Sequence, residues 1–486
     1  MNLMNLATKL IAAARTAAWL ALLVAPFCTA FGQGSLMPVG PPAPTMKTLA
    51  QIEARTPISS APFTINQSGS YYLTNNLTVS SGDAITIASS GVTLDLNGFA
   101  ISSTAPTVTG IAIRINTALQ DLVIQNGFIL SGVTNTGGTY SGPGFANGIM
   151  FVHPQNPKNV RVTNVTVTGC RFNGIYLAGE STLVESCIVR TVGGIGFWAG
   201  TLRSSSATDC GGIAILGELI SDCRGENTGS ADAIRGFTVQ NCSGYSVSGI
   251  GISAQSAQNS YGNGGDKGVS AWTALGCFGQ SGNGTGLYAE STAENCHGYS
   301  YGDAPGVWAL SAQNCRGFSN SGRGVFAETA ENCYGASASG VGGAGIFADI
   351  AQNCRGFSSN GVGISATTAL NCIGYTNTSI GLFCVTAQNC QGYTTTGGTG
   401  LSAQKSAQNC YGSGGYGIQA GQSQGGVATN CHGVSTGNGS GLLTDIAIGC
   451  YGSSPNGPGI VTIIANCCRG IGSPIGVSAS FKYNMP

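Results

Sequence analysis

Two aspartates and an arginine are the residues of this chain whose types and spacing best suit acid–base chemistry. Asp209 and Asp222 each precede a cysteine, where later segments carry asparagine, and Arg224 follows Asp222 by two residues. Two carboxylates near a guanidinium could share acid and base roles, or the carboxylates could hold a calcium ion. The alternative is structural: aspartate fills the same bend as asparagine, with its charge turned to solvent or paired.

A second group of residues suits binding rather than catalysis. One set directly follows successive cysteines: His297, Arg316, Tyr334 and Arg355. An aromatic set follows glycine–aliphatic pairs: Tyr288, Trp308, Phe326 and Phe347. Another aromatic set lies three residues after a cysteine: Tyr245, Tyr299, Phe318, Phe357, Tyr375 and Tyr393. Aromatic rows suit the apolar faces of sugar rings, and exposed apolar strips mark interaction sites. The alternatives are a solvated face, or rings that only stack on one another or lie under a loop.

These residues belong to a repeated unit. Cysteines recur from Cys277 to Cys467 with a mean spacing of 19 residues, and the glycines that open each segment, from Gly286 to Gly476, keep the same mean. Two markers with one period indicate a single structural repeat. The candidate site residues are therefore expected to stack as vertical columns, one residue from each unit.

Each unit has the periodicity of short strands broken by bends. Small or apolar residues alternate with variable ones, as in Val325, Ala327, Ala330, Cys333 and Gly335. Runs of Gly, Ser, Asn and Thr exclude a helical repeat. The pattern predicts an all-β fold: a parallel β-helix of roughly 20 short turns, or rungs, of about 19 residues, stacked about 4.8 Å apart.

The asparagine and cysteine columns are interpreted as structural. Asparagine tolerates the left-handed backbone of a sharp bend, and stacked copies can pair their amides. Cysteines on adjacent rungs would have parallel Cβ vectors about 4.8 Å apart, which suits packing better than disulfides. We expect buried, mostly free thiols, with Cys384 and the pair Cys467 and Cys468 as exceptions. Without a CxxC pair, and with three scattered histidines, no zinc site is predicted.

Composition excludes some classes of partner. Glycine accounts for 78 of 486 residues and charged residues for 8%. The 19 basic and 19 acidic residues cancel, so no overall field would attract nucleic acid or an anionic membrane. The regular apolar positions argue against a disordered linker, because they supply surface to bury.

The first 30 residues predict an export signal. Lys9 and Arg15 precede an apolar run at residues 17–27, and small residues end at Ala30. The run is shorter than the about 20 residues of a membrane-spanning helix, which leaves an anchor as the alternative, and no later segment is apolar enough to span. The mature chain is expected to be periplasmic, extracellular or on the cell surface. The predicted organisation is 1–30 signal peptide, 31–62 proline-rich linker and N-terminal cap, 63–476 β-helix and 477–486 C-terminal cap.

The beginning of the repeat region carries a family resemblance. The segment GSYYLTNNLTVSSGDAITIASSGVTLDLNGFAIS at residues 69–102 alternates strands with Gly and Asn-Gly turns. It resembles the opening of bacterial exported right-handed parallel β-helix repeat proteins of the pectin-lyase-like superfamily. TLAQIEARTPISS at residues 48–60 resembles their leader. The resemblance covers residues 46–250 well and the remainder in general terms. It implies right-handed coiling, with a left-handed solenoid of 18-residue turns as the alternative.

That superfamily includes pectate lyases and polygalacturonases, so the resemblance raises polysaccharide chemistry. Such lyases use clustered aspartates to hold calcium with an arginine or lysine base, and the hydrolases use paired aspartates with Gly-His-Gly and Arg-Ile-Lys motifs. Neither motif is present in this chain. A resemblance of this kind supports a fold and does not fix an activity.

The sequence therefore favours an exported β-helix that binds carbohydrate or another surface polymer along its outer strips, without catalysis. No cofactor is predicted, although calcium would accompany the enzymatic alternative. That alternative is a polysaccharide lyase or glycoside hydrolase centred on Asp209, Asp222 and Arg224. A third hypothesis is a structural or adhesive surface rod. The sequence identifies neither the polymer nor the oligomeric state.

Overall fold

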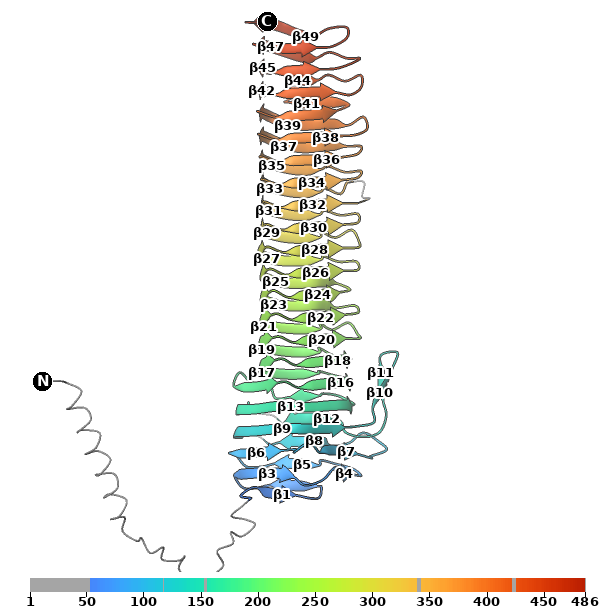
Figure 1. Ribbon diagram of the computed structural model, residues 1–486. Helices are drawn as coiled ribbons and strands as arrows, with labels where there is room; N and C mark the ends of the chain where they lie inside the picture. Colours follow the sequence, from blue (N-terminus) through green and yellow to red (C-terminus); the bar gives the residue numbers. More distant parts are fainter. Residues whose placement is uncertain (1–52, 117, 153–154, 339–341, 422–424, 486) are drawn as a thin grey trace, which may run out of the picture. The chain divides into compact units, whose positions relative to one another are not determined.

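The computed structural model describes residues 53–116, 118–152, 155–338, 342–421 and 425–485. The unit Arg55–Pro486 is a parallel β-helix of about 22 turns with a period near 19 residues (Figure 1). The described residues contain strands and no helix, so the predicted all-β class is confirmed, and the chain is a parallel β-helix repeat protein as its resemblance implied. The predicted signal peptide and most of the predicted linker lie outside the described residues.

One rung of the repetitive part shows the construction. Strand β29 (Val307–Gln313) is divided at Leu310, which carries no pairing of its own, and a bend at Asn314 leads into β30 (Arg316–Ser319). Each rung therefore offers three pairing segments. All three pair in parallel with the next rung, β31 (Val325–Glu331) and β32 (Tyr334–Ser337). The register is direct: equivalent residues of successive repeats lie beside one another.

The core is a narrow column of small side chains. Val307, Ala309, Ala312, Cys315 and Ser319 point inward from one rung and are at most 2% exposed. The N-terminal rungs fill the same interior with larger aliphatic residues, including Ile85, Leu94, Ile101, Ile113 and Ile124. No rung could bury its inward face alone, so stacking supplies the apolar burial that stabilises the fold.

The asparagine column is confirmed as the bend before the third segment, except at its last predicted member: Asn466 ends strand β47 (Ile460–Asn466), and Cys467 takes the bend instead. Its members have left-handed φ values between 46° and 55°: Asn241, Asn259, Asn295, Asn314, Asn332, Asn353, Asn371, Asn389, Asn409 and Asn430. Some of their side-chain amides hydrogen-bond between rungs, as Asn389 Nδ2 does to Asn371 Oδ1 at 3.1 Å. Gly276 and Gly449 take the same bend with φ of 62°. The column therefore selects residues that tolerate this backbone conformation.

The cysteine column is confirmed as a buried interior file of free thiols, with one correction. From Cys277 to Cys450 the members are as predicted and at most 2% exposed. The last member is Cys468, which is 1% exposed, whereas Cys467 occupies the bend with φ of 53° and is exposed. Typical members donate to carbonyl groups, as Cys315 Sγ does to Ala293 at 3.3 Å and to Gln313 at 3.2 Å. Cys384 lies off this file, as expected, and is also buried and free.

Burial disfavours the thiolate form of Cys170 and Cys187. It raises the pKa of Cys170 to about 12 and that of Cys187 to about 11. The cysteines therefore pack as small apolar groups. Among the residues that the structure describes, no helix is both long and apolar enough to cross a bilayer.

Candidate functional site

The third segment of each rung presents two outward side chains with a glycine between them. In β30 these are Arg316 and Phe318, with Gly317 turned inward. The first outward residues form the cysteine-side file, which includes the predicted strip in one continuous register: His297, Arg316, Tyr334 and Arg355. The second outward residues form the loop-side file, which includes Tyr299, Phe318, Phe357, Tyr375 and Tyr393. The predicted stacking is therefore confirmed for both files.

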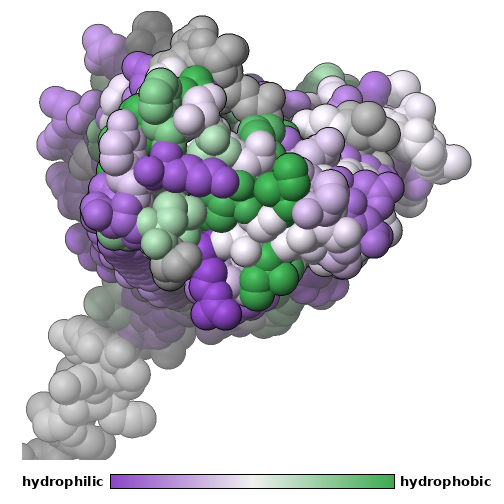
Figure 2. All heavy atoms as spheres, turned by 90° about the horizontal axis from the view of Figure 1, so that it is seen from above, coloured by the Kyte–Doolittle hydropathy of each residue, from purple (hydrophilic) through white to green (hydrophobic). Residues whose placement is uncertain are grey.

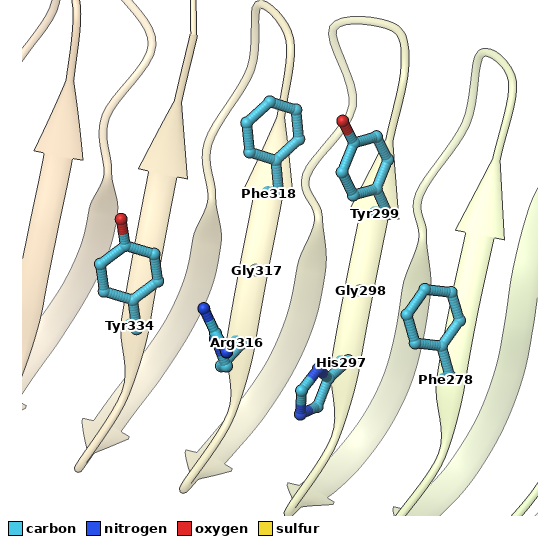
Figure 3. A pocket seen from close by; sticks show the side chains of 8 residues that line it. All are labelled: Phe278, His297, Gly298, Tyr299, Arg316, Gly317, Phe318 and Tyr334. Atoms are coloured by element: carbon cyan, nitrogen blue, oxygen red, sulfur yellow. The ribbon is translucent and has the colours of Figure 1, made fainter.

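A groove of about 250 Å³ lies between the two files across β26 (Phe278–Ser281), β28 (His297–Ser300), β30 and β32 (Figure 3). Its lining consists of Phe278, His297, Gly298, Tyr299, Arg316, Gly317, Phe318 and Tyr334. Glycines between the two rows of side chains are required by the fold. A Cβ atom on Gly317 would overlap the carbonyl oxygen of Gly324, so the groove lies over inward positions that admit no side chain.

Aromatic and cationic groups alternate around the groove. The rings of Tyr299 and Phe318 stack with centroids 4.4 Å apart, and the Arg316 guanidinium lies 5.5 Å from the centre of the Tyr334 ring. Phe278 and Tyr334 are 38% and 40% exposed, so ring surface remains open to solvent. Within the described residues Arg316 has no carboxylate partner, which leaves its donors free for a ligand.

The cysteine-side file continues beyond the groove toward the C-terminal end. Tyr411, His432 and Tyr451 follow one another in register, with His432 at 5.2 Å and 4.6 Å from the two tyrosine rings. Partial burial lowers the pKa of His432. On the outward surface of this sheet, aromatic rings therefore alternate with polar or basic side chains over many rungs.

The predicted column of Tyr288, Trp308, Phe326 and Phe347 is also one register, on the first segment of each rung. Its rings are half-buried and contact one another: Tyr288 and Trp308 stack at 4.5 Å, and Phe326 meets Phe347 edge-on at 5.5 Å. Arg323 lies over both phenylalanines, at 4.4 Å and 4.1 Å from the ring centres. Much of the ring surface in this column is thus covered by neighbouring rings, which was the alternative to binding. The groove on the third segment is the more accessible surface.

The structure does not bring Asp209, Asp222 and Arg224 together. Asp222 lies in the asparagine column with φ of 55° and accepts from Asn241 Nδ2 at 3.2 Å. Asp209 does not replace a ladder asparagine: it lies within β18 (Ser206–Cys210), next to Cys210, whose register partner is Asn227 at the end of β20 (Arg224–Asn227). The two aspartates therefore occupy different positions along their rungs: Asp222 lies at the bend before the third segment, and Asp209 lies late in that segment. Arg224 pairs with Glu226 instead of with either aspartate.

Asp209 has a structural partner that the sequence did not indicate. The hairpin of β10 (Thr134–Thr136) and β11 (Thr139–Ser141) folds back against this rung. Asp209 Oδ1 accepts from Asn135 Nδ2 at 2.6 Å and from the Tyr140 hydroxyl at 3.0 Å. Tyr140 is 3% exposed, and its burial raises the pKa of the phenol. Asp209 therefore anchors the hairpin. Within the described chain, no group of three or more His, Cys, Asp or Glu side chains converges to hold a metal ion.

Comparisons with known proteins give little guidance. No family model matches the chain, and no curated protein matches it. Two solved structures of the catalytic domain of a GH87 alpha-1,3-glucanase in complex with nigerose, one of them a variant, align at 13% and 12% identity. Each alignment covers 91% of this chain and 70% of the other chain, with a TM-score of 0.26. Similarity at this level does not bear on what the chain binds.

Sequence reasoning missed one member of the groove. Phe278 directly follows Cys277, the same signal that identified His297 and Arg316, and extending that column by one rung would have found it. The neighbouring Tyr261 stacks on Phe278 at 5.4 Å and continues the file.

Proposed function

We propose that this chain is an exported protein that binds a polysaccharide or related surface polymer along the groove of β26, β28, β30 and β32, without catalysis. The observation that carries the proposal is the pair of outward files. Aromatic rings line both sides of a groove in which Arg316 has no carboxylate partner among the residues that the structure describes. Aromatic surface suits the apolar faces of sugar rings, and guanidinium donors suit hydroxyl or acidic oxygens.

The geometry favours an elongated ligand. The two files run from rung to rung, so equivalent contacts recur about every 4.8 Å along the stack. A polymer lying lengthwise would meet several such contacts at once, and its apparent affinity would grow with chain length. A compact small molecule would use only the rungs of the groove itself.

The non-catalytic part of the proposal rests on the carboxylates. The groove lining contains no aspartate or glutamate, and Asp209 and Asp222 lie apart with structural partners of their own. Hydrolysis or elimination of a glycosidic bond by paired groups needs both to reach the same bond.

A binding and cleavage assay on one polysaccharide panel tests both parts. Wild type, Arg316→Ala and Phe318→Ala are compared for retention, and supernatants are assayed for new reducing or unsaturated ends. Tyr416→Ala is the matched control, because Tyr416 is exposed but lies outside the groove. We expect retention to weaken at least about tenfold in Arg316→Ala, since a hydrogen bond to a charged group contributes about 1.5–3 kcal/mol. Retention should also weaken in Phe318→Ala, because ring surface that would face a sugar is lost, and it should stay unchanged in the control. Equal retention by all variants would overturn the binding site, and new chain ends would overturn the absence of catalysis.

A further inference from the structure

The third segments of the rungs from β24 (Tyr261–Gly264) to β46 (Tyr451–Ser453) carry an unbroken row of rings. Each of these segments places an aromatic or histidine ring at one of its two outward positions at least. In the cysteine-side file the row consists of Tyr261, Phe278, Tyr334, Tyr411, His432 and Tyr451. In the loop-side file it consists of Tyr299, Phe318, Phe357, Tyr375 and Tyr393. This row, the ring track, extends over about 50 Å and continues past both ends of the groove.

The ring track crosses between the two files without missing a rung. Figure 3 shows this in the groove, where Phe278 and Tyr334 lie on the cysteine side and Tyr299 and Phe318 lie on the loop side. Further along, the track returns to the cysteine side between two tyrosines, Tyr393 and Tyr411, whose ring centroids are 5.5 Å apart. A ring on every rung is therefore maintained although its position on the strand changes.

The rings of the first segment behave differently. The column that begins at Tyr288 and ends at Phe347 has Ser270 at the same register on the rung before it and Ser365 on the rung after it. Mutual packing explains such a short column. The ring track is longer than any run of rings within one file, and none of its members is buried. This continuity points to a ligand that needs a ring on each rung.

Neighbouring rings of the track are spaced like the sugars of an extended glycan. The centroids of Tyr375 and Tyr393 are 4.8 Å apart, and those of Tyr261 and Phe278 are 5.4 Å apart. In a linear β-1,4-linked glycan the equatorial linkages keep the chain extended, so each sugar advances by about one rung spacing, about 4.8 Å. An α-linked glucan coils, and its successive sugars do not follow a straight row.

We infer that the polymer is a linear β-1,4-linked glycan that lies along the ring track with one sugar on each rung. This inference rests on the proposed function and adds the linkage class and the register of the ligand. Arg316 and Arg355 lie two residues from Phe318 and Phe357 on the same strands, so their donors would face the hydroxyl groups of a sugar resting on the ring. Figure 2 views the molecule along the stack from the C-terminal end, which is the direction in which the glycan would run.

Co-sedimentation of the full chain with insoluble glycans tests the linkage class. Cellulose and chitin both present β-1,4-linked chains and differ in their side groups, whereas insoluble amylose presents α-linked chains. We expect retention on cellulose, chitin or both to be at least about tenfold stronger than on amylose, because only an extended chain engages many rungs at once. Equal or stronger retention on amylose would overturn the inference and leave the groove as a polysaccharide site. Retention on none of the three would also overturn it, and the wider polysaccharide panel would then decide the proposed function separately.

Ring variants outside the groove test the register. Tyr393 belongs to the ring track but does not line the groove. Tyr393→Ala is expected to weaken retention about two- to tenfold, the range for one aromatic stacking contact, and Tyr393→Phe, which keeps the ring, should preserve it. Trp272→Ala is the control, because Trp272 is 52% exposed on β25 (Lys267–Leu275) and lies outside the track. Tyr375→Ala serves if Tyr393→Ala does not fold. Unchanged retention by Tyr393→Ala, together with a loss in Phe318→Ala, would confine binding to the groove and overturn the inference.

Discussion

The carbonyl oxygen of Gly324 occupies the space that a Cβ atom on Gly317 would need. The same overlap recurs between Gly298 and Gly306 one rung earlier. These glycine pairs set how closely the third segment of one rung approaches the first segment of the next. Gly317→Ala is therefore expected to lower the free energy of unfolding by about 1–3 kcal/mol, as overpacking does. Denaturant unfolding measures this. Gly282→Ala is the control, because a Cβ atom there meets nothing within 4 Å, and an equal loss in both variants would contradict the explanation.

Two features of Asn389 are expected to contribute to stability: its side-chain hydrogen bonds to neighbouring rungs and its tolerance of the left-handed bend. This residue has φ of 55°, donates to Asn371 and accepts from Asn409 at 3.2 Å. Asn389→Ala loses both amide contacts and strains the backbone, with an expected cost of about 1–2 kcal/mol. Asn389→Gly loses the contacts but relieves the strain, as Gly276 and Gly449 do, and should cost less. Thermal unfolding of both variants checks the order, and glycine being the worse substitution would contradict it.

Thiol labelling should distinguish Cys467 from the interior file. Among the cysteines described, Cys467 is the exposed one, and the others are buried. Under native conditions, Cys467→Ser is expected to lose the single equivalent of thiol that reacts rapidly with a thiol reagent, because the other described thiols are buried and inaccessible to the reagent. Cys468→Ser serves as the comparison and should leave the rapid phase unchanged. After denaturation, the wild type should release its remaining thiols to the reagent.

Alkaline pH should destabilise the fold. An ordinary thiol has a pKa of 9.0, whereas burial raises the pKa of Cys170 to about 12 and of Cys187 to about 11. The folded state thus holds its protons more tightly, so stability is fully present below pH 9 and falls as pH rises toward 11 or 12. For each such thiol, the free energy of unfolding falls by about 1.4 kcal/mol per pH unit within that window. Unfolding midpoints at pH 7, 9 and 10 measure this decline.

Cys170→Val provides a control for the alkaline effect, because valine already occupies the adjacent rung at this register, at Val192. This variant should lose less stability between pH 9 and 10 than the wild type. Identical pH profiles for the two proteins would show that the buried thiols are not responsible.

The contacts of Asp209 predict a local effect on the hairpin. Asp209→Ala removes the acceptor that holds Asn135 and the buried Tyr140 hydroxyl, so β10 and β11 should become more accessible to protease. Cleavage rates at the hairpin measure this. Asp222→Ala is the matched variant: it removes an aspartate from a bend on a neighbouring rung, and it should leave hairpin cleavage unchanged. Equal cleavage of both variants would contradict the anchoring role.

The fold was predictable because inward and outward residues alternate with a fixed period. Val325, Ala327, Ala330 and Cys333 all point inward, and the outward columns stack as the spacing required. The error at the last cysteine arose because Cys467 and Cys468 are adjacent and spacing alone accepts either. The pattern Cys–x–Gly, present at Cys315 and again at Cys468, would have selected the correct one.

The candidate site was only partly predictable, because loops and insertions do not follow the period. Nothing in the repeat places Arg323 over Phe326 and Phe347. The hairpin that contacts Asp209 comes from residues about 70 positions earlier in the chain, a contact that local spacing cannot reveal. The sequence period thus predicts which residues stack in one column. It does not predict which other side chains or loops pack over that column, because those contacts join residues far apart in the sequence.

The strict register between neighbouring rungs has a consequence for how such a protein changes size. Almost every backbone contact reaches only one turn up or down, so an inserted or deleted repeat needs no new core and disturbs two interfaces at most. Tandem duplication within the gene could therefore lengthen the outward surface in steps of one unit, and the length of the surface would change independently of the side chains on any single turn.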